Sequence, residues 1–321
     1  MCPNQEIVPE RPVALVLGGS RGLGLLIAEQ LLRRGHLVVV AARDVAEVEA
    51  AARALEAFGP VRAERCDVRD RHEVGDLVGR VEHSIGPIEV LVTVAGIIQT
   101  APAESLVLHE FEDAIETMAW GPIHAAMTVL PHMRRRGHGR IGTVTSVGGM
   151  VSPPHLLPYA TAKFAAVGFS DGLASALSGS GVTATTIVPG LMRTGGHLHA
   201  SFGGDPAAEY AWFAPAASLP LLSIDADRAA RRIVDAVLAG RAMVVLTPLA
   251  WVGIRVRGLA PAMTTRVMGL MGRLLPSAPS RAGAHTVDGA EARRRLGSPS
   301  VARRSTTGDP SRQTQQRLSA T

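Results

Sequence analysis

Short apolar runs alternate with helical patterns along the first two thirds of this chain. Seven runs have the length and composition of buried strands, at residues 13–17, 37–41, 61–66, 88–94, 140–145, 183–188 and 242–246. Helical patterns separate them, at residues 23–34, 45–58, 71–84, 111–135, 158–177 and 225–238. Strands that alternate with helices indicate βαβ units, and near-continuous apolar strands favour a parallel sheet covered on both faces. The sequence therefore predicts an α/β fold with a doubly wound parallel sheet.

A glycine-rich turn lies between the first predicted strand and the first predicted helix. Its residues are Leu17-Gly18-Gly19-Ser20-Arg21-Gly22-Leu23-Gly24. Glycines permit a tight turn and let backbone N–H groups approach a pyrophosphate, to which the helix N-terminus adds a partial positive charge. An ordinary strand-to-helix turn can also be rich in glycine. The position after a strand and before a helix nevertheless favours a nucleotide site.

The end of the second predicted strand bears on the choice of nucleotide. An acidic residue there would bind a ribose 2′-hydroxyl and repel a 2′-phosphate. This sequence has Ala41-Ala42-Arg43 instead, and Arg21 in the glycine turn can supply a second positive charge. Because a guanidinium can bind a phosphate in bidentate fashion, NADP(H) is favoured over NAD(H). The alternatives are that Arg43 is a solvated surface residue or that Asp44 turns inward.

Tyr159 and Lys163 lie four residues apart in a predicted helix, so their side chains share one face. A phenol has a pKa of about 10, and a neighbouring ammonium favours the phenolate and lowers that pKa. Ser146 directly follows a predicted strand, where its hydroxyl can hold a carbonyl oxygen. Tyr-x-x-x-Lys is common on surface helices, but Lys163 is the only lysine among 33 basic residues. Arginine does not readily take a tuned pKa, so this lysine favours a catalytic role.

These residues resemble the short-chain dehydrogenase/reductase family, in its ordinary rather than extended branch. The family's Thr-Gly-x-x-x-Gly-x-Gly corresponds to residues 17–24, and its serine, tyrosine and lysine correspond to Ser146, Tyr159 and Lys163. The remaining matches are Asp67-Val68 after the third strand, Ala95-Gly96 in the motif Thr93-Val94-Ala95-Gly96, Pro189-Gly190 after the sixth strand, and Thr194. The resemblance covers about residues 12 to 250, and its motifs agree in order and spacing.

The resemblance implies a Rossmann-type sheet of about seven strands and hydride transfer between NADP(H) and a carbonyl or alcohol. It implies that Tyr159 donates the proton, that Lys163 holds the nicotinamide ribose and lowers the pKa of the tyrosine, and that Ser146 polarises the carbonyl. Asp67 would bracket the adenine, and Thr194 would contact the nicotinamide amide. The family is commonly a homodimer or homotetramer.

Two departures from the family pattern concern asparagines. Met118 stands where the family carries an asparagine that anchors a water in a proton relay, and Asn4 is the only asparagine in the chain. Thr93 and Val94 replace both asparagines of the strand-4 motif. The first loss predicts a slower enzyme or a different water path, and the second bears on how the central strand is braced.

A non-catalytic NADP(H)-binding sensor or scaffold is the alternative function. An epimerase or dehydratase of the extended branch fits the glycine spacing less well.

Composition divides the chain into a neutral body and a basic tail. From residue 276 onward there are eight arginines and three acids, which accounts for the whole net charge of +5 and argues against a nucleic-acid-binding body. We expect an N-terminal arm at 1–11, an NADP-binding catalytic domain at 12–250 with a substrate loop at 191–222, a helical extension at 251–275 and a disordered tail at 276–321. The loop is apolar and weakly charged, which favours a lipophilic substrate.

The extension is apolar with interspersed arginines, and residues 236–287 contain no Asp or Glu. It is expected to pack over the substrate cleft or in a dimer interface; the alternative is an interfacial helix in peripheral contact with anionic lipid.

Two cysteines, Cys2 and Cys66, form no disulfide framework, and the N-terminus has no secretory signal, so we expect a cytoplasmic protein. His197 and His199 have no nearby carboxylate or cysteine partner, so we expect no metal site.

Overall fold

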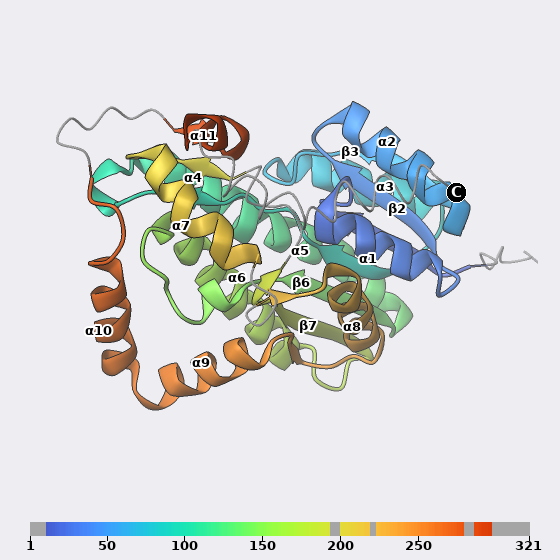
Figure 1. Cartoon of the computed structure of the whole chain (residues 1–321). Coiled ribbons are helices and arrows are strands. Elements are labelled where there is room, and N and C mark those ends of the chain that lie inside the picture. Colours follow the sequence, from blue (N-terminus) through green and yellow to red (C-terminus); the bar gives the residue numbers. More distant parts are fainter. Residues whose placement is uncertain (1–10, 193–199, 219–222, 279–285, 297–321) are drawn as a thin grey trace, which may run out of the picture.

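The computed structural model describes residues 11–192, 200–218, 223–278 and 286–296. Seven parallel strands form its central sheet in the order β11-β7-β6-β4-β1-β2-β3 (Figure 1). Their bounds are β1 (Val13–Leu17), β2 (Leu37–Ala42), β3 (Val61–Arg65), β4 (Ile88–Thr93), β6 (Gly139–Val144), β7 (Val182–Val188) and β11 (Met243–Val245). Each coincides with a predicted strand to within a residue at either end. The predicted doubly wound α/β fold is confirmed.

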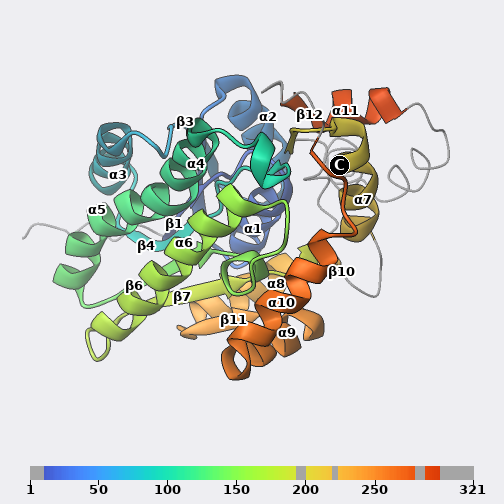
Figure 2. The same cartoon turned by 90° about the vertical axis from the view of Figure 1, so that its left-hand side faces the viewer.

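Two layers of helices cover this sheet. One face carries α1 (Gly22–Leu32), α2 (Val45–Leu55) and α8 (Ala226–Leu238), and the other carries α3 (Arg71–Ser84), α5 (Gly121–Arg136) and α6 (Leu157–Ala176) (Figure 2). Successive strand residues point to opposite faces, so Val38 and Val40 pack into the first layer while Val39 packs into the second. Burial on both faces explains why the central strands β1 and β2 are apolar at every position.

The strand order reverses between β1 and β4, because β2 and β3 extend to one side and β6 and β7 to the other. In an open parallel sheet, the connections on either side of such a reversal leave in opposite directions and open a crevice at the carboxyl ends. The glycine turn after β1 and the loop after β4 meet there: the N–H groups of Val94 and Ala95 both donate to the Leu17 carbonyl, at 2.8 and 3.1 Å. Backbone hydrogen bonds therefore brace the central strands at this point.

The helix predicted at 111–135 is divided in the structure. A short helix α4 (Leu108–Ile115) passes into a π-helical turn, Glu116–Trp120, and only then into α5. Pro122 lacks an N–H and cannot donate to the Met118 carbonyl, which an uninterrupted α-helix would require. The wider turn accommodates this missing donor.

A smaller layer covers one end of the sheet. It contains β5 (Gln99–Thr100), β9 (Ser201–Phe202), α7 (Pro206–Ser218), β12 (Val287–Asp288) and α11 (Gly289–Leu296), beside the short pair β8 (Leu191–Met192) and β10 (Ser223–Ile224). The predicted substrate loop thus contains a helix and strand segments. The prediction of a disordered tail from residue 276 is wrong for 286–296, because β12 pairs with β9 and Ala292 of α11 is fully buried.

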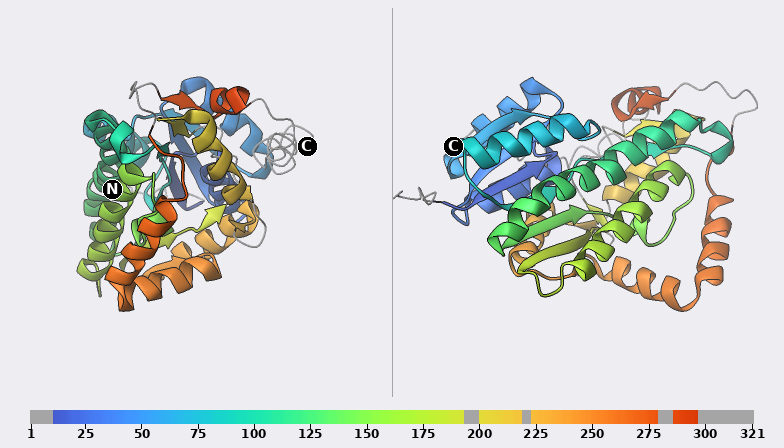
Figure 3. Two further views of the ribbon diagram at one scale, coloured as in Figure 1. Left: turned by 60° about the vertical axis from the view of Figure 1, so that its left-hand side comes forward. Right: turned by 180° about the vertical axis from the view of Figure 1, so that it is seen from behind.

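The predicted helical extension forms two helices, α9 (Pro248–Leu259) and α10 (Pro261–Gly272). They run along the rim of the molecule, outside the two layers that cover the sheet (Figures 1 and 3). Pro261 explains the break, since a proline disfavours helical geometry at the residue before it and starts a helix well. Among the described residues, no helix is long and apolar enough to cross a bilayer.

Candidate active site

A cavity of about 480 Å³ opens at the carboxyl ends of the strands, where the strand order reverses. The predicted site residues that line it are Gly18, Ser20, Arg21, Gly22, Leu23, Gly24, Arg43, Asp67, Val68, Ala95, Gly96, Ser146, Tyr159, Lys163, Pro189 and Gly190. Thr194, His197 and His199 lie outside the described residues. The fold therefore brings every described member of the predicted set into one cavity.

The glycine turn is shaped by close backbone approach. Gly18 has φ +86°, and a Cβ on it would lie 2.5 Å from the Ala95 nitrogen. A Cβ on Gly24 would overlap the Gly18 carbonyl oxygen. Helix α1 begins at Gly22, so its unpaired N–H groups lie at the cavity. This cradle fits the pyrophosphate of a dinucleotide.

The charged residues beside this turn differ in their partners. The Arg21 guanidinium donates to Glu47 Oε1 at 3.1 Å, and Ser20 Oγ donates to Glu47 Oε2 at 3.3 Å. Asp44 caps α2 by accepting the N–H of Glu47 at 2.9 Å, so its carboxylate is engaged by its own helix. Arg43 is exposed at the cavity and makes no ion pair with a described residue. Of the two arginines predicted to face a phosphate, Arg43 is the unpaired one.

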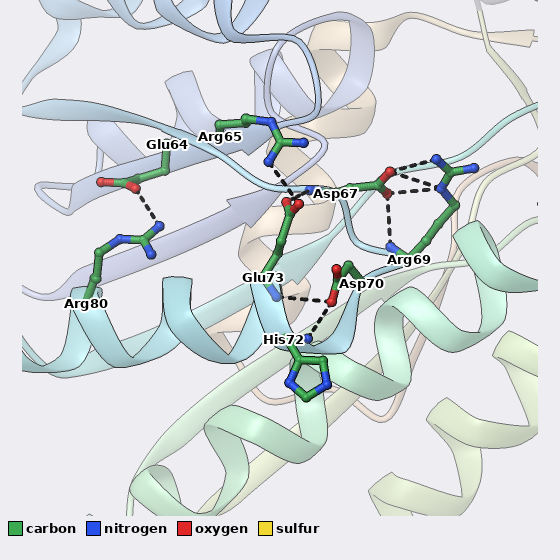
Figure 4. Close-up of polar contacts among 8 residues, drawn as sticks. All are labelled: Glu64, Arg65, Asp67, Arg69, Asp70, His72, Glu73 and Arg80. Atoms are coloured by element: carbon green, nitrogen blue, oxygen red, sulfur yellow. Dashed lines mark hydrogen bonds and ion pairs between the residues drawn. The ribbon is translucent and has the colours of Figure 1, made fainter.

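The carboxylate after β3 is held by residues that the sequence reading did not single out (Figure 4). Asp67 accepts hydrogen bonds from the Arg69 guanidinium, the shortest at 2.8 Å, and from the Arg69 N–H at 3.1 Å. Burial by itself raises the pKa of Asp67, but these bonds hold it below its usual value. Glu73 accepts the N–H of Asp67 at 2.9 Å and is paired with Arg65. Asp67 is therefore ionised and fixed in orientation.

Lys163 is buried beneath Tyr159, and its ammonium donates to the Val144 carbonyl at 2.8 Å. Nζ lies 5.9 Å from the centre of the Tyr159 ring. Desolvation lowers the pKa of Lys163 to about 8. Burial also raises the pKa of Tyr159, and the hydrogen bond with Ser146 offsets this only in part. The expected lowering of the tyrosine pKa by Lys163 is therefore not found here, because desolvation of the phenolate is the larger effect.

Two glycines after Ser146 allow this packing. The Gly148 N–H donates to Ser146 Oγ at 3.0 Å, and a Cβ on Gly148 would lie 3.0 Å from the Tyr159 ring. A Cβ on Gly149 would lie 2.5 Å from the Lys163 carbonyl oxygen. The Ser146 turn can therefore lie this close to the helix that carries Tyr159 because residues 148 and 149 are glycines. A Gly-Gly pair that begins two residues after a candidate catalytic serine was a sequence signal for this.

A family model described as short chain dehydrogenase matches residues 12–200, more than half of the chain. The chain belongs to the short-chain dehydrogenase family. It is thus an oxidoreductase that acts on carbonyl or alcohol groups, in a family that uses NAD(P)(H).

The short-chain dehydrogenase relatives are enzymes of varied substrates. Gluconate 5-dehydrogenase of Gluconobacter oxydans (strain 621H) is 33% identical, over 56% of this chain and 71% of its own length. Oxidoreductase BOA17 of Botryotinia fuckeliana (strain B05.10) is 34% identical, over 56% of this chain and 65% of its own length, just under two thirds. The human 17-beta-hydroxysteroid dehydrogenase 13 is 27% identical over a longer stretch, 81% of this chain.

Two solved structures share the fold. A short-chain dehydrogenase from Streptomyces avermitilis has a TM-score of 0.70 and 26% identity, over 83% of this chain and 98% of its own. A single-residue variant of the actinorhodin polyketide ketoreductase, crystallised with NADPH, has a TM-score of 0.64 and 27% identity, over 74% of this chain and 95% of its own.

Met118 and Thr93 stand where the short-chain dehydrogenase pattern has asparagines, and the structure shows what each side chain contacts. Met118 is buried in the π-helical turn, with Sδ 3.4 Å from the Cβ position of Gly96 at the cavity wall. Thr93 Oγ1 donates to the Gly142 carbonyl of β6 at 3.5 Å. Thr93 thus makes a weak side-chain bond between β4 and β6, and the main bracing at this point comes from the backbone.

An aromatic cluster beside the cavity was not assigned by sequence reasoning. Phe202, Tyr210 and Phe213 pack edge to face and, with Ala292, contact Trp212 and Tyr159. Below them, Glu209 accepts a hydrogen bond from Trp212 Nε1 at 2.8 Å and contacts His155 Nδ1 at 2.8 Å. Burial raises the pKa of Glu209. The sequence signal was the concentration of aromatic residues at 202–213 in a chain with only 3% aromatics.

Proposed function

We propose that this short-chain dehydrogenase transfers a hydride between NADP(H) and the carbonyl or alcohol of a lipophilic substrate, with Tyr159 as acid and base. The observation that carries the proposal is the convergence of Ser146, Tyr159 and Lys163 on the same cavity as the glycine turn. A pure nucleotide binder has no need of a serine, tyrosine and lysine in this arrangement.

The preference for NADP(H) rests on charge at the end of β2. Arg43 has no acidic partner among the described residues, and the nearest acid in sequence, Asp44, caps a helix. A 2′-phosphate can therefore take the guanidinium without displacing a carboxylate. Arg21 is paired with Glu47 and would have to exchange that partner. The ketoreductase similar to this chain was crystallised with NADPH.

The side chains divide the proton chemistry between them. When bound, NADP(H) supplies the hydride for reduction. Tyr159 keeps its proton at neutral pH, because its pKa is raised, and can donate it to a carbonyl oxygen. Ser146, hydrogen-bonded to the tyrosine, would hold that oxygen in place. With a pKa of about 8, Lys163 is mostly charged at neutral pH and favours the phenolate that remains.

A lipophilic substrate is favoured by the wall of the site around Tyr159. Ile97 and Ile98 line the cavity and pack with this tyrosine. Behind them the tyrosine packs with a buried cluster that contains Leu156, Phe202, Trp212 and Phe213. Glu209, the buried acid of this region, has both carboxylate oxygens engaged by His155 and Trp212. Apolar surroundings with few free polar groups are typical of sites for apolar ligands.

We also propose a homodimer or homotetramer for this member of a family that commonly oligomerises. Large apolar side chains are exposed on adjacent helices of one layer, with Trp120 and Met127 at α5 and Leu157 and Phe164 on α6. A two-fold axis across these helices would bury them against their own copies. Sedimentation velocity of wild type and of Met127→Glu tests this; a monomeric wild type would contradict it.

The proposed function is tested first by nucleotide binding and turnover. We expect NADPH, followed by its fluorescence, to bind more tightly than NADH. NADPH oxidation with a panel of ketones, aldehydes and quinones should identify a substrate, and Tyr159→Phe should abolish that turnover while NADPH affinity is kept. Tight NADPH binding without turnover across the panel would favour a sensor or scaffold. Failure to bind either nucleotide would overturn the proposal.

A further inference from the structure

Helices α9 and α10 expose an unusual amount of apolar surface. Ten of the eighteen exposed large apolar side chains among the described residues lie on these two helices or directly after them. They are Leu249, Trp251, Val252, Val256, Leu259, Met263, Val267, Leu270, Met271 and Leu274. Scattered exposed apolar residues are ordinary, but a contiguous group on a water-soluble domain marks a contact surface.

On α9 these residues form a stripe that points away from the body. Leu249, Val252, Val256 and Leu259 follow one another at intervals of three, four and three residues, which places them on one face of the helix. Leu259 is 89% exposed. Ala250, on the opposite face, is buried. This apolar stripe is therefore directed at solvent.

Helix α10 repeats this arrangement. Met263, Val267, Leu270 and Leu274 follow at intervals of four, three and four residues, and Leu274 is 86% exposed. The other face carries the buried Thr264 and also Gly272, whose Cβ position lies 3.3 Å from Pro154. Both helices therefore lie against the body by one face, which includes Ala250 and Ile254 on α9 and Thr264 and Met268 on α10, and leave the stripes exposed.

The charges around the two stripes have one sign. Arg255, Arg266 and Arg273 are exposed beside them, and no Asp or Glu occurs between residues 236 and 287. Arg255 stacks on Trp251, with its guanidinium carbon 3.2 Å from the ring centre. Exposed Trp and Leu side chains with arginines beside them match the requirements of the interfacial zone of a bilayer.

We propose that α9 and α10 form a docking surface for anionic phospholipid. Neither helix can cross a bilayer, so the contact is peripheral. A second copy of this chain is a poorer occupant, because a two-fold contact would set each arginine-flanked stripe against another of the same charge. Anionic headgroups complement the arginines while the acyl boundary takes the apolar side chains. The proposal does not depend on the substrate proposed above.

The test uses the full chain with vesicles of phosphatidylcholine alone or mixed equally with phosphatidylglycerol, separated by flotation. We expect binding to the mixed vesicles, and weakening by high salt. Leu259→Ser combined with Leu274→Ser should lower the partition coefficient at least about tenfold. Leu108→Ser is the matched control, since Leu108 is 80% exposed but lies on α4.

The contribution of the arginines is measured separately from that of the leucines. Arg266→Gln and Arg273→Gln should each lower binding to the mixed vesicles about fivefold and leave weak binding to neutral vesicles unchanged. NADPH affinity, measured on every variant, shows that the nucleotide domain remains folded. Absence of binding to the mixed vesicles by wild type would overturn the proposal. Equal binding by wild type and by the double leucine variant would also overturn it. So would a wild type that does not bind vesicles but forms oligomers that the leucine substitutions dissociate.

Discussion

Lys163 donates its hydrogen bond to the carbonyl of Val144, the last residue of β6, and not to Tyr159. Ser146 lies two residues farther along the same chain segment, so the end of one strand positions both the lysine and the serine around the tyrosine. The ammonium lies 5.9 Å from the centre of the Tyr159 ring, without a hydrogen bond between them. Its effect is therefore electrostatic, and it depends on the charge state of a lysine whose pKa is lowered to about 8.

The pH dependence of carbonyl reduction follows from this arrangement. Below pH about 8 Lys163 carries its charge and Tyr159 its proton, which is the state that the reduction requires. As pH rises through 8 the ammonium is lost, so we expect turnover to fall while the tyrosine is still protonated. A pH profile of turnover at saturating NADPH measures this, with substrate ionisation excluded by a neutral ketone. A rate that stays level from pH 7 to about 10, the usual pKa of tyrosine, would contradict the assignment.

The same lysine should lower the stability of the protein without bound nucleotide. Its pKa falls from the ordinary 10.5 to about 8 on folding, a cost of about 3 kcal/mol when the group is charged. This cost is present below pH 8 and disappears as the pH rises toward 10.5, because the unfolded chain then loses its proton as well. We expect Lys163→Met to be inactive but more stable than wild type at pH 7, by about 1–3 kcal/mol. Urea unfolding of both proteins at pH 7 and 10 should show that difference shrinking; a constant difference would argue against it.

Arg43 is predicted to select the nucleotide. Arg43→Ala removes an exposed guanidinium and should weaken NADPH binding about tenfold, while NADH affinity changes little. Arg53→Ala is the matched control, because Arg53 is also an exposed arginine, farther along α2 and paired with Glu49. Fluorescence titrations with both nucleotides measure the ratio. Equal losses for NADPH and NADH in Arg43→Ala would mean that the arginine does not contact the 2′-phosphate.

Local sequence patterns were sufficient for the strands and for the glycine turn, because both depend on residues close together in the chain. The Ser146, Tyr159 and Lys163 set also followed from spacing and from the rarity of lysine. The direction of the Tyr159 pKa shift could not be predicted from the sequence, because it depends on burial, which arises from packing. The Asp67–Arg69 pairing could not be predicted without the directions of the two side chains. The folded structure of residues 286–296 could not be predicted either, because it depends on pairing with β9. A tail poor in apolar residues can therefore fold where another segment supplies the core.

Met118 tests how the proton relay works without the family's asparagine. We expect Met118→Asn to raise turnover by up to about tenfold and to alter its pH dependence, because an amide can anchor a water that a thioether binds poorly. The variant should lose about 1–2 kcal/mol of stability, since the site is buried. Met118→Leu, which conserves volume, is the control and should leave the pH profile unchanged. An unchanged turnover and profile in Met118→Asn would show that the relay does not pass this side chain.

Helix α11 is predicted to support the substrate site from outside, through the aromatic cluster that packs against Tyr159. Ala292 is fully buried in the cluster of Phe202, Tyr210 and Phe213, whereas Ala290 on the same helix is exposed. Ala292→Asp places an unpaired carboxylate in that cluster and should detach α11 from α7. We expect a raised KM for the carbonyl substrate, unchanged NADPH affinity and faster proteolysis within α7. Ala290→Asp should match wild type in all three; a variant Ala292→Asp with an unaltered KM would mean that α11 does not support the substrate site.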